Sequence, residues 1–120
     1  MKKTYKRHIT GKIGEDLAIK YLKNKGYKII ERNFQCRQGE IDIIAKDKDE
    51  IVIIEVKTRK CLDYGNPAEA VDDNKRKRIY KSAEYYLYIK KLEKFYVRID
   101  VIEIYIKRNK YYINHIKNIY

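Results

Sequence analysis

The hydrophobic and polar positions along the chain alternate in two ways, and together they predict seven elements. Apolar residues recur at helical spacing from Thr10 to Lys25, where Thr10 is placed to cap the start of a helix and Gly26 to end it. Period-two patterns predict strands, and a second helical pattern occurs in the second half of the chain. These further segments are strands Tyr27–Phe34, Gly39–Lys46 and Ile51–Arg59, a loop with Asp63, Gly65, Asn66 and Pro67, helix Asp73–Lys90, strand Phe95–Ile106, a polar turn Lys107–Lys110 and a strand from Tyr111.

The order of these elements, αβββαββ, predicts a mixed α/β domain in which two principal helices accompany one sheet. No repeat and no Gly/Ser/Pro-rich linker divides the 120 residues, so residues 1–120 are expected to form a single domain around one hydrophobic core. The pattern leaves the order of the strands in the sheet open.

Composition excludes several classes of protein. Apolar residues make up 44% of the chain and recur periodically, which excludes a disordered chain. The longest apolar run is only five residues, Tyr85–Ile89, so no membrane span is expected, and no apolar segment follows the basic start as a secretory signal would require. Cys36 and Cys61 lack metal-binding spacing, and we expect both to be reduced thiols in a cytoplasmic protein.

The net charge points to a polyanionic partner. The chain has 29 Lys and Arg against 17 Asp and Glu, a formal charge of +12, which favours nucleic acid as the partner. A bias toward Lys in the composition would produce the same charge without any binding function. Charge alone therefore does not choose between DNA, RNA and a merely basic surface.

One stretch has the opposite charge. Residues 40–55 contain six acidic and two basic residues, a net −4 within a chain of +12. Three of the acids suit a polar turn between two strands: Asp47, Asp49 and Glu50. Glu40, Asp42 and Glu55 lie inside strand patterns instead, where a turn does not explain them.

Hairpin geometry brings these acids together. For a turn centred at residues 48–49, the numbers of paired residues sum to 97, so Asp42 faces Glu55 and Glu40 faces Lys57. Facing side chains have Cβ atoms about 4.5–5.5 Å apart, and two carboxylates at that distance repel unless a cation lies between them. Lys57 is one such cation, and a divalent metal held by oxygen ligands, Mg²⁺ or Mn²⁺, is the other.

A third carboxylate belongs to the first predicted helix. Glu15 falls within the apolar arc of that helix, and a carboxylate on a core-facing side needs a partner because its unpaired burial is costly. Either a nearby cation or backbone donor pairs with it, or it points toward the same metal site. Asp100, in mid-strand beside Arg98, has the same two interpretations.

The second predicted helix opens with a basic run. Positive charge in a first turn opposes the helix dipole, so this placement favours phosphate contact by Lys75, Arg76 and Arg78 over a solvated face. Asp72 and Asp73 precede the run and suit a helix cap. Thirteen tyrosines invite base stacking, but a helix-spaced cluster is better explained by packing: Tyr80, Tyr85, Tyr86 and Tyr88.

The segment Gly39-Glu40-Ile41-Asp42, followed after twelve residues by Glu55-Val56-Lys57-Thr58-Arg59, resembles the PD-(D/E)xK nuclease signature, with Ile41 where the short signature has Pro. A wider resemblance is to the YraN-like family of bacterial proteins, which are similar to Holliday-junction resolvases. It rests on Thr10-Gly11-x-x-Gly14-Glu15-x-x-Ala18, Arg32-Asn33, Lys75-Arg76-Lys77-Arg78 and Arg98-Ile99-Asp100-Val101.

This resemblance implies a restriction-endonuclease-like fold and an Mg²⁺- or Mn²⁺-dependent DNA endonuclease that acts on branched or damaged DNA. It implies that Asp42, Glu55 and the Val56 carbonyl bind the metal, that Lys57 positions the attacking water, and that Glu15 assists. A homodimer would suit two symmetric cuts in a junction. A non-catalytic nucleic-acid-binding module on the same fold is the alternative, and a structural or ribosome-associated basic protein is a third reading. Glu40 remains a further candidate.

Overall fold

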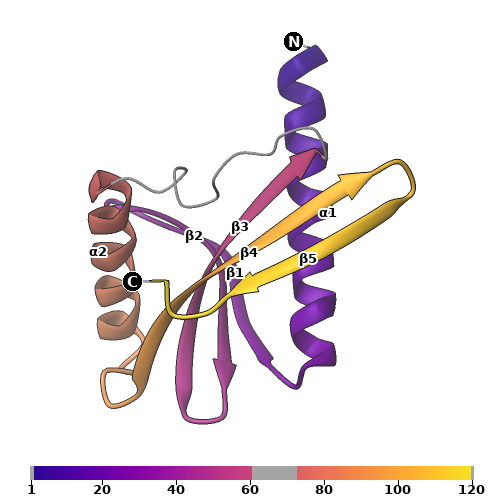
Figure 1. Cartoon of the computed structure of the whole chain (residues 1–120). Coiled ribbons are helices and arrows are strands. Elements are labelled where there is room, and N and C mark those ends of the chain that lie inside the picture. The colour runs from indigo at the N-terminus through magenta and orange to yellow at the C-terminus, as the bar shows by residue number, and fades with distance from the viewer. Residues whose placement is uncertain (1, 61–72, 120) are drawn as a thin grey trace.

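A five-stranded mixed sheet with a helix on each face forms the protein (Figure 1). The computed structural model describes the backbone of residues 2–60 and 73–119 and the side chains of residues 11–59 and 73–119. The elements are α1 Lys2–Asn24, β1 Lys28–Cys36, β2 Gly39–Asp47, β3 Glu50–Lys60, α2 Asp73–Ile89, β4 Tyr96–Lys107 and β5 Lys110–Ile116. The predicted order αβββαββ is confirmed, and the fold is compatible with the restriction-endonuclease-like class.

The strands lie in the order β1-β2-β3-β4-β5, which the sequence pattern had left open. Only β3 and β4 pair in parallel, and the other neighbours pair antiparallel. Parallel neighbours need a long crossover connection, and α2 lies in the connection between β3 and β4. The crossover places the first turn of α2 near the end of β3.

Each face of the sheet carries its own apolar core. On one face α1 contributes Ala18 and Leu22, and on the other α2 contributes Ile79, Ala83 and Tyr86. The central strand β3 supplies both cores through a continuous apolar run, Ile51, Val52, Ile53 and Ile54, all at most 1% exposed. A strand covered on both faces needs such a run rather than an alternating pattern.

The start of α1 was predicted wrongly. The helix begins at Lys2 rather than at Thr10, because residues 2–9 contain no glycine or proline that would stop a helix. Its predicted end is confirmed: Gly26 has a φ of 91°, and the Tyr27 N–H donates to the Leu22 carbonyl at 3.0 Å. This pairing is the Schellman arrangement that glycine favours at a helix end.

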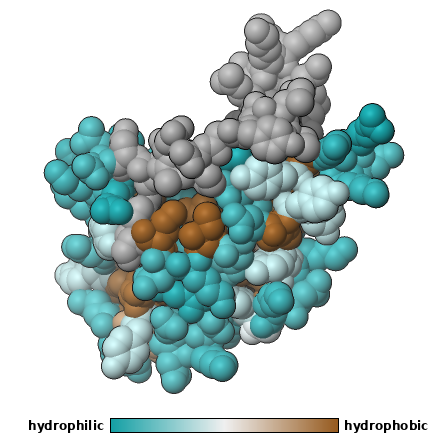
Figure 2. Space-filling model, viewed as in Figure 1, coloured by the Kyte–Doolittle hydropathy of each residue, from teal (hydrophilic) through white to brown (hydrophobic). Residues whose placement is uncertain are grey.

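The surface seen from the side of Figure 1 is mostly hydrophilic, with a small apolar area between α2 and the paired β4 and β5 (Figure 2). Within the described residues, no helix is both long and apolar enough to cross a membrane. Cys36 is a free thiol, as predicted. Cys61, Asp72 and the loop predicted at residues 63–67 lie outside the described residues.

Candidate functional site

The β2–β3 hairpin brings Asp42 beside the Glu55–Val56 peptide. The predicted register is confirmed over the paired residues, from Asp47 opposite Glu50 to Ile43 opposite Ile54. Just beyond the last of these pairs, the Val56 N–H donates a hydrogen bond of 2.8 Å to Asp42 Oδ2. The carboxylate of Asp42 is therefore anchored to β3 by a side-chain bond, at the place where the register puts it.

Most of the predicted site residues line one hollow of about 340 Å³ between the sheet and the start of α2. Its lining consists of Gly39, Glu40, Asp42, Glu55, Lys57, Lys75, Arg78 and Ile79. Asp42 and Glu40 come from β2, Glu55 and Lys57 from β3, and the other two charged residues from α2. The fold thus gathers three acids and three bases from three elements in one place.

Burial makes the two central carboxylates interact strongly. Burial, followed by the charge of Asp42, raises the pKa of Glu55 to about 7, against the opposing effect of Lys75 and Lys57. The pKa of Asp42 is also raised by burial, although the Val56 hydrogen bond acts against the rise. Lys75 Nζ lies 3.8 Å from Glu55 Oε2, so α2 supplies a cation at ion-pair distance.

Lys57 lies in the same hollow, where burial lowers its pKa instead of raising it. Burial, followed by the neighbouring ammonium of Lys75, lowers the pKa of Lys57 to about 8, although Glu55 and Asp42 act to raise it. An amine with a pKa of about 8 is mostly charged at neutral pH and becomes a proton acceptor at only slightly higher pH. The side chain is thus suited both to phosphate contact and to proton transfer.

Asp42 and Glu55 are the side chains of this hollow best placed to act as ligands of a metal ion. Across residues 11–59 and 73–119, no three His, Cys, Asp or Glu side chains form a metal-binding group, so Glu40, the third acid of the hollow, does not complete one with these two carboxylates. The raised pKa of both acids fits a divalent cation, because a cation stabilises the charged forms that burial disfavours. An all-oxygen donor set suits Mg²⁺ or Mn²⁺ rather than a softer metal.

Glu15 lies in a neighbouring hollow rather than in the one that holds Asp42 and Glu55. This second hollow, of about 650 Å³, also contains Arg32, whose Nη2 lies 3.4 Å from Glu15 Oε1. Burial raises the pKa of Glu15, and so does the charge of Asp42, while Arg32 lowers it. Of the two interpretations, the ion pair with Arg32 is present, and Glu40 borders both hollows.

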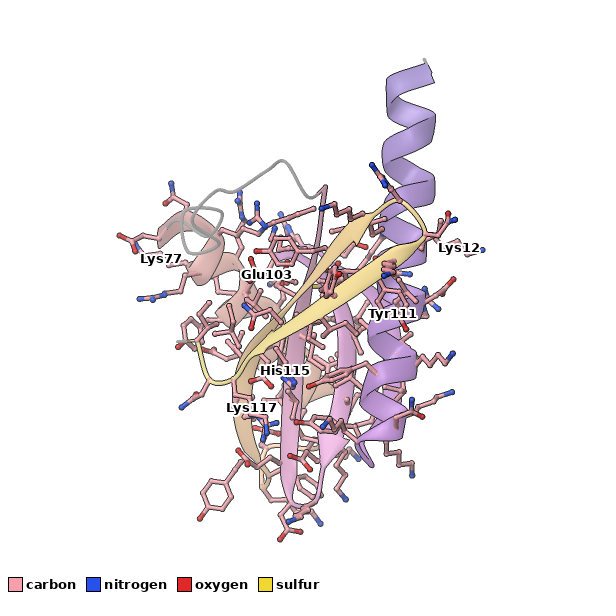
Figure 3. All side chains as sticks on the ribbon, turned by 45° about the vertical axis from the view of Figure 1, so that its right-hand side comes forward. Lys12, Lys77, Glu103, Tyr111, His115 and Lys117 are labelled. Atoms are coloured by element: carbon pink, nitrogen blue, oxygen red, sulfur yellow. The ribbon has the colours of Figure 1, made fainter. Side chains whose placement is uncertain are left out.

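Some of the basic residues at the start of α2 face the site, and others do not. The helix begins at Asp73 as predicted. Lys75 is half-buried and lines the hollow together with Arg78, while Arg76 is exposed. Lys77 extends away from the sheet (Figure 3). The residues predicted for phosphate contact therefore divide into two that line the hollow and one on the outer surface beside it.

Asp100 belongs to a different cluster, and its pairing with Arg98 is present. It is fully buried and receives hydrogen bonds from Arg98 Nε at 3.2 Å, His115 Nε2 at 2.7 Å and the Asn118 N–H at 2.8 Å. Burial alone would raise the pKa of Asp100, but the bonds from His115 and Asn118 and the Arg98 charge hold it below its ordinary value. It lines none of the hollows at the site.

Sequence reasoning missed Glu103 and Arg59. Glu103 is fully buried, pairs with Lys57 in the β3–β4 register, and lies on β4 over the middle of the sheet (Figure 3). Its carboxylate lies 3.3 Å from Arg59 Nε and accepts a hydrogen bond of 2.8 Å from Asn114 Nδ2. Period-two alternation from Lys57 marks Arg59 as its neighbour on the same face, but only the strand order brings Glu103 there.

Comparison with known proteins identifies close relatives. A family model described as "Uncharacterised protein family UPF0102" matches residues 14–104, which include Asp42, Glu55 and Lys57. A UPF0102 protein of Clostridium botulinum strain Hall is 51% identical over 111 residues, 90% of each chain. A UPF0102 protein of Clostridium perfringens strain 13 is 50% identical over 119 residues, 97% of this chain and 96% of that protein. None of these names states an activity.

Proposed function

The chain belongs to the uncharacterised protein family UPF0102, the YraN-like family, and we propose that it is a metal-dependent nuclease that hydrolyses phosphodiester bonds in branched or damaged DNA. The observation that carries this proposal is the meeting of Asp42, Glu55 and Lys57 in one hollow, with Lys75 and Arg78 at its side. Acids that suit a hard cation, beside bases that suit a phosphate, are the parts that phosphodiester hydrolysis requires.

In this proposal Asp42 and Glu55 hold Mg²⁺ or Mn²⁺, together with the backbone carbonyl of Val56. The metal, when bound, supplies a Lewis acid and lowers the pKa of bound water. The hydrogen bond from Val56 to Asp42 keeps that carboxylate oriented, since one of its oxygens is held by β3. Lys75 neutralises Glu55 until the cation binds, and is then able to contact a phosphate.

Lys57 has the central role among the chain's own groups. As an ammonium it stabilises the negative charge that develops on the phosphoryl oxygens, and as an amine it takes a proton from the attacking water. Its pKa of about 8 makes both states accessible near neutral pH. Arg78 and Lys75, on the opposite wall, neutralise the phosphates on either side of the one that is cut.

A second candidate function is a nucleic-acid-binding module without cleavage. It is favoured by one observation: the described residues offer two acidic side chains for a metal and no group of three. In such a module the same hollow binds phosphate through Lys57, Lys75 and Arg78, and the carboxylates only set the geometry of these bases.

The test is a cleavage assay on labelled duplex, single-stranded, flap and four-way-junction DNA with Mg²⁺ or Mn²⁺. Asp42→Asn and Lys57→Ala are the site variants, and Asp49→Asn, in the exposed hairpin turn, is the matched control. The nuclease predicts metal-dependent cutting that both site variants lose and the control retains. Binding without cutting on every substrate, unchanged in Asp42→Asn, would instead establish the module.

A further inference from the structure

A third hollow, of about 300 Å³, continues the candidate active site along α2. It is lined by Gln38, Lys81, Glu84, Tyr85 and Tyr88. Arg78 of the first hollow precedes Lys81 by one helical turn, and Gly39 of the first hollow follows Gln38 directly. The walls meet here, because a Cβ placed on Gly39 would lie 3.3 Å from the Ser82 hydroxyl. Figure 1 shows the end of β1 and the start of β2 reaching the first turns of α2.

We name the first and third hollows together the α2 groove, and its helical wall has a regular composition. At about 100° per residue, Arg78, Lys81, Tyr85 and Tyr88 fall within an arc of about 80° on one side of α2. The ten steps from Arg78 to Tyr88 span about 15 Å at 1.5 Å per residue, the length of roughly four stacked nucleotides at 3.4 Å each. Cations thus lie near the active site, and aromatic rings lie farther along.

The tyrosines of α2 have different environments. Tyr86 is 1% exposed and packs in the core, whereas Tyr85 is 43% exposed and Tyr88 is 68% exposed. The centroid of the Tyr85 ring lies 6.4 Å from that of Phe34, so Tyr85 is supported by a neighbouring ring although it is partly exposed. Exposed, supported rings are the platforms on which unpaired bases stack. The packing explanation therefore holds for Tyr86 and does not account for Tyr85 and Tyr88.

The charge and polarity of the groove suit a nucleic-acid backbone. Beyond the acids of the first hollow, Arg78 and Lys81 lie on the helical wall and Arg37 lies in the β1–β2 turn, while the lining of the third hollow has one acid, Glu84. Ser82 is completely buried, and its hydroxyl has no hydrogen-bond partner in the described part of the chain. Gln38 Oε1 is a second buried oxygen without a partner there. Both buried groups lie beside the place where β2 approaches α2, and the positive charges that face solvent in the groove are those of Arg78 and Lys81.

We propose that the α2 groove binds a single-stranded DNA segment next to the phosphate that is cut, with bases stacked on Tyr85 and Tyr88 and phosphates beside Arg78 and Lys81. This inference rests on the proposed function for its position beside the cut, and it identifies the substrate class as DNA with a single-stranded arm. Fully paired duplex DNA offers no unstacked bases to these rings.

Binding is tested without metal, so that cleavage plays no part. Fluorescence anisotropy with a labelled oligo-dT of about 12 nucleotides in EDTA compares wild type with the Tyr85→Ala/Tyr88→Ala double variant. We expect about tenfold weaker binding or more, with recovery in Tyr85→Phe/Tyr88→Phe, because Phe retains the stacking face. Glu84→Gln is expected to tighten binding. Tyr112→Ala, on β5 at 58% exposure, is the matched control and is expected to bind like wild type.

Three results would overturn the groove. The first is oligo-dT binding by the double alanine variant within twofold of wild type, which is expected of a protein-docking face. The second is an equal loss of oligo-dT affinity in the double Phe and double Ala variants. The third is tighter binding of oligo-rU than of oligo-dT by wild type. Cleavage by wild type is measured separately with Mg²⁺ or Mn²⁺. If wild type cuts DNA and the double alanine variant binds oligo-dT like wild type, only the groove proposal is rejected. If binding depends on the two tyrosines but wild type cuts no substrate, only the nuclease proposal is rejected.

Discussion

Val56 donates its backbone N–H to the Asp42 carboxylate at 2.8 Å, and this bond joins β2 to β3 where the candidate active site begins. It directs an acid at the edge of the hairpin toward Glu55 instead of into solvent. The bond also opposes the rise in the Asp42 pKa that burial causes, so it favours the charged form of the carboxylate. A charged Asp42 then raises the pKa of Glu55.

Asp42→Asn should lower the pKa of Glu55 from about 7. Asparagine retains an oxygen that accepts the Val56 hydrogen bond, so the geometry is kept while the charge is lost. After burial, the charge of Asp42 is the largest cause that raises the Glu55 pKa, and its removal lets that pKa fall. Carboxyl ¹³C NMR titration measures the change. Glu40→Gln is the matched control and should give a smaller fall; an unchanged Glu55 pKa in Asp42→Asn would reject this account.

Metal binding should stabilise the protein more at pH 8 than at pH 5.5. The pKa of Glu55 in the folded chain, about 7, exceeds its ordinary 4.5, so its stabilising contribution is complete below pH 4.5 and is lost as the pH rises through 7. The loss is on the order of 3 kcal/mol, at about 1.4 kcal/mol per pKa unit. A divalent cation replaces the proton and restores this stability, so millimolar Mg²⁺ should raise the Tm chiefly at pH 8.

Thermal melts followed by circular dichroism at both pH values measure this effect. Glu55→Gln is the informative variant, because it has no charge to lose and should show both a smaller decline with pH and a smaller response to Mg²⁺. A Tm increase in wild type of equal size at both pH values would contradict competition between proton and metal at Glu55.

Asp100→Asn should destabilise the fold by about 3 kcal/mol because, of the three carboxylates that pair with the Arg98 guanidinium, it removes the charge of the one that is fully buried. The pKa of Asp100 is held below its ordinary 3.8, so its contribution is present above that pH and is lost as the pH falls. Urea unfolding at pH 7 and at pH 3 measures both effects. The decrease in the free energy of unfolding caused by Asp100→Asn should be smaller at pH 3 than at pH 7. An equal decrease at both pH values would contradict the ion-pair explanation.

Gly14→Ala should destabilise the protein because α1 crosses β3 closely at this point. A Cβ on Gly14 would clash with the Thr58 hydroxyl, and such overpacking costs about 1–3 kcal/mol. In a Thr58→Ala background that oxygen is absent, so the same substitution should cost clearly less. A double-mutant cycle measured by urea unfolding gives the coupling. Gly11→Ala, which meets nothing within 4 Å, is the matched control and should leave stability unchanged or improved.

Much of the site was predictable because its parts are close in sequence. A two-residue turn sets the hairpin register, and just beyond its last pair Asp42 bonds to Val56 and shares one hollow with Glu55 and Lys57. The wrong start of α1 has a similarly local cause, since Thr10 is a good cap residue but nothing before it stops a helix. For Glu15, the pattern correctly required a partner without naming Arg32, which is 17 residues away in another element.

The sequence by itself thus determined the elements, the hairpin register and the cluster of charges, because side-chain periodicity and turn length act over about ten residues. Only the tertiary structure decided that β4 lies parallel beside β3, which places Glu103 next to Lys57. It also separated the buried Tyr86 from the exposed Tyr85 and Tyr88. Such outcomes depend on which distant segments pack together, and that choice is made by the burial of apolar area on both faces of the sheet rather than by any local pattern.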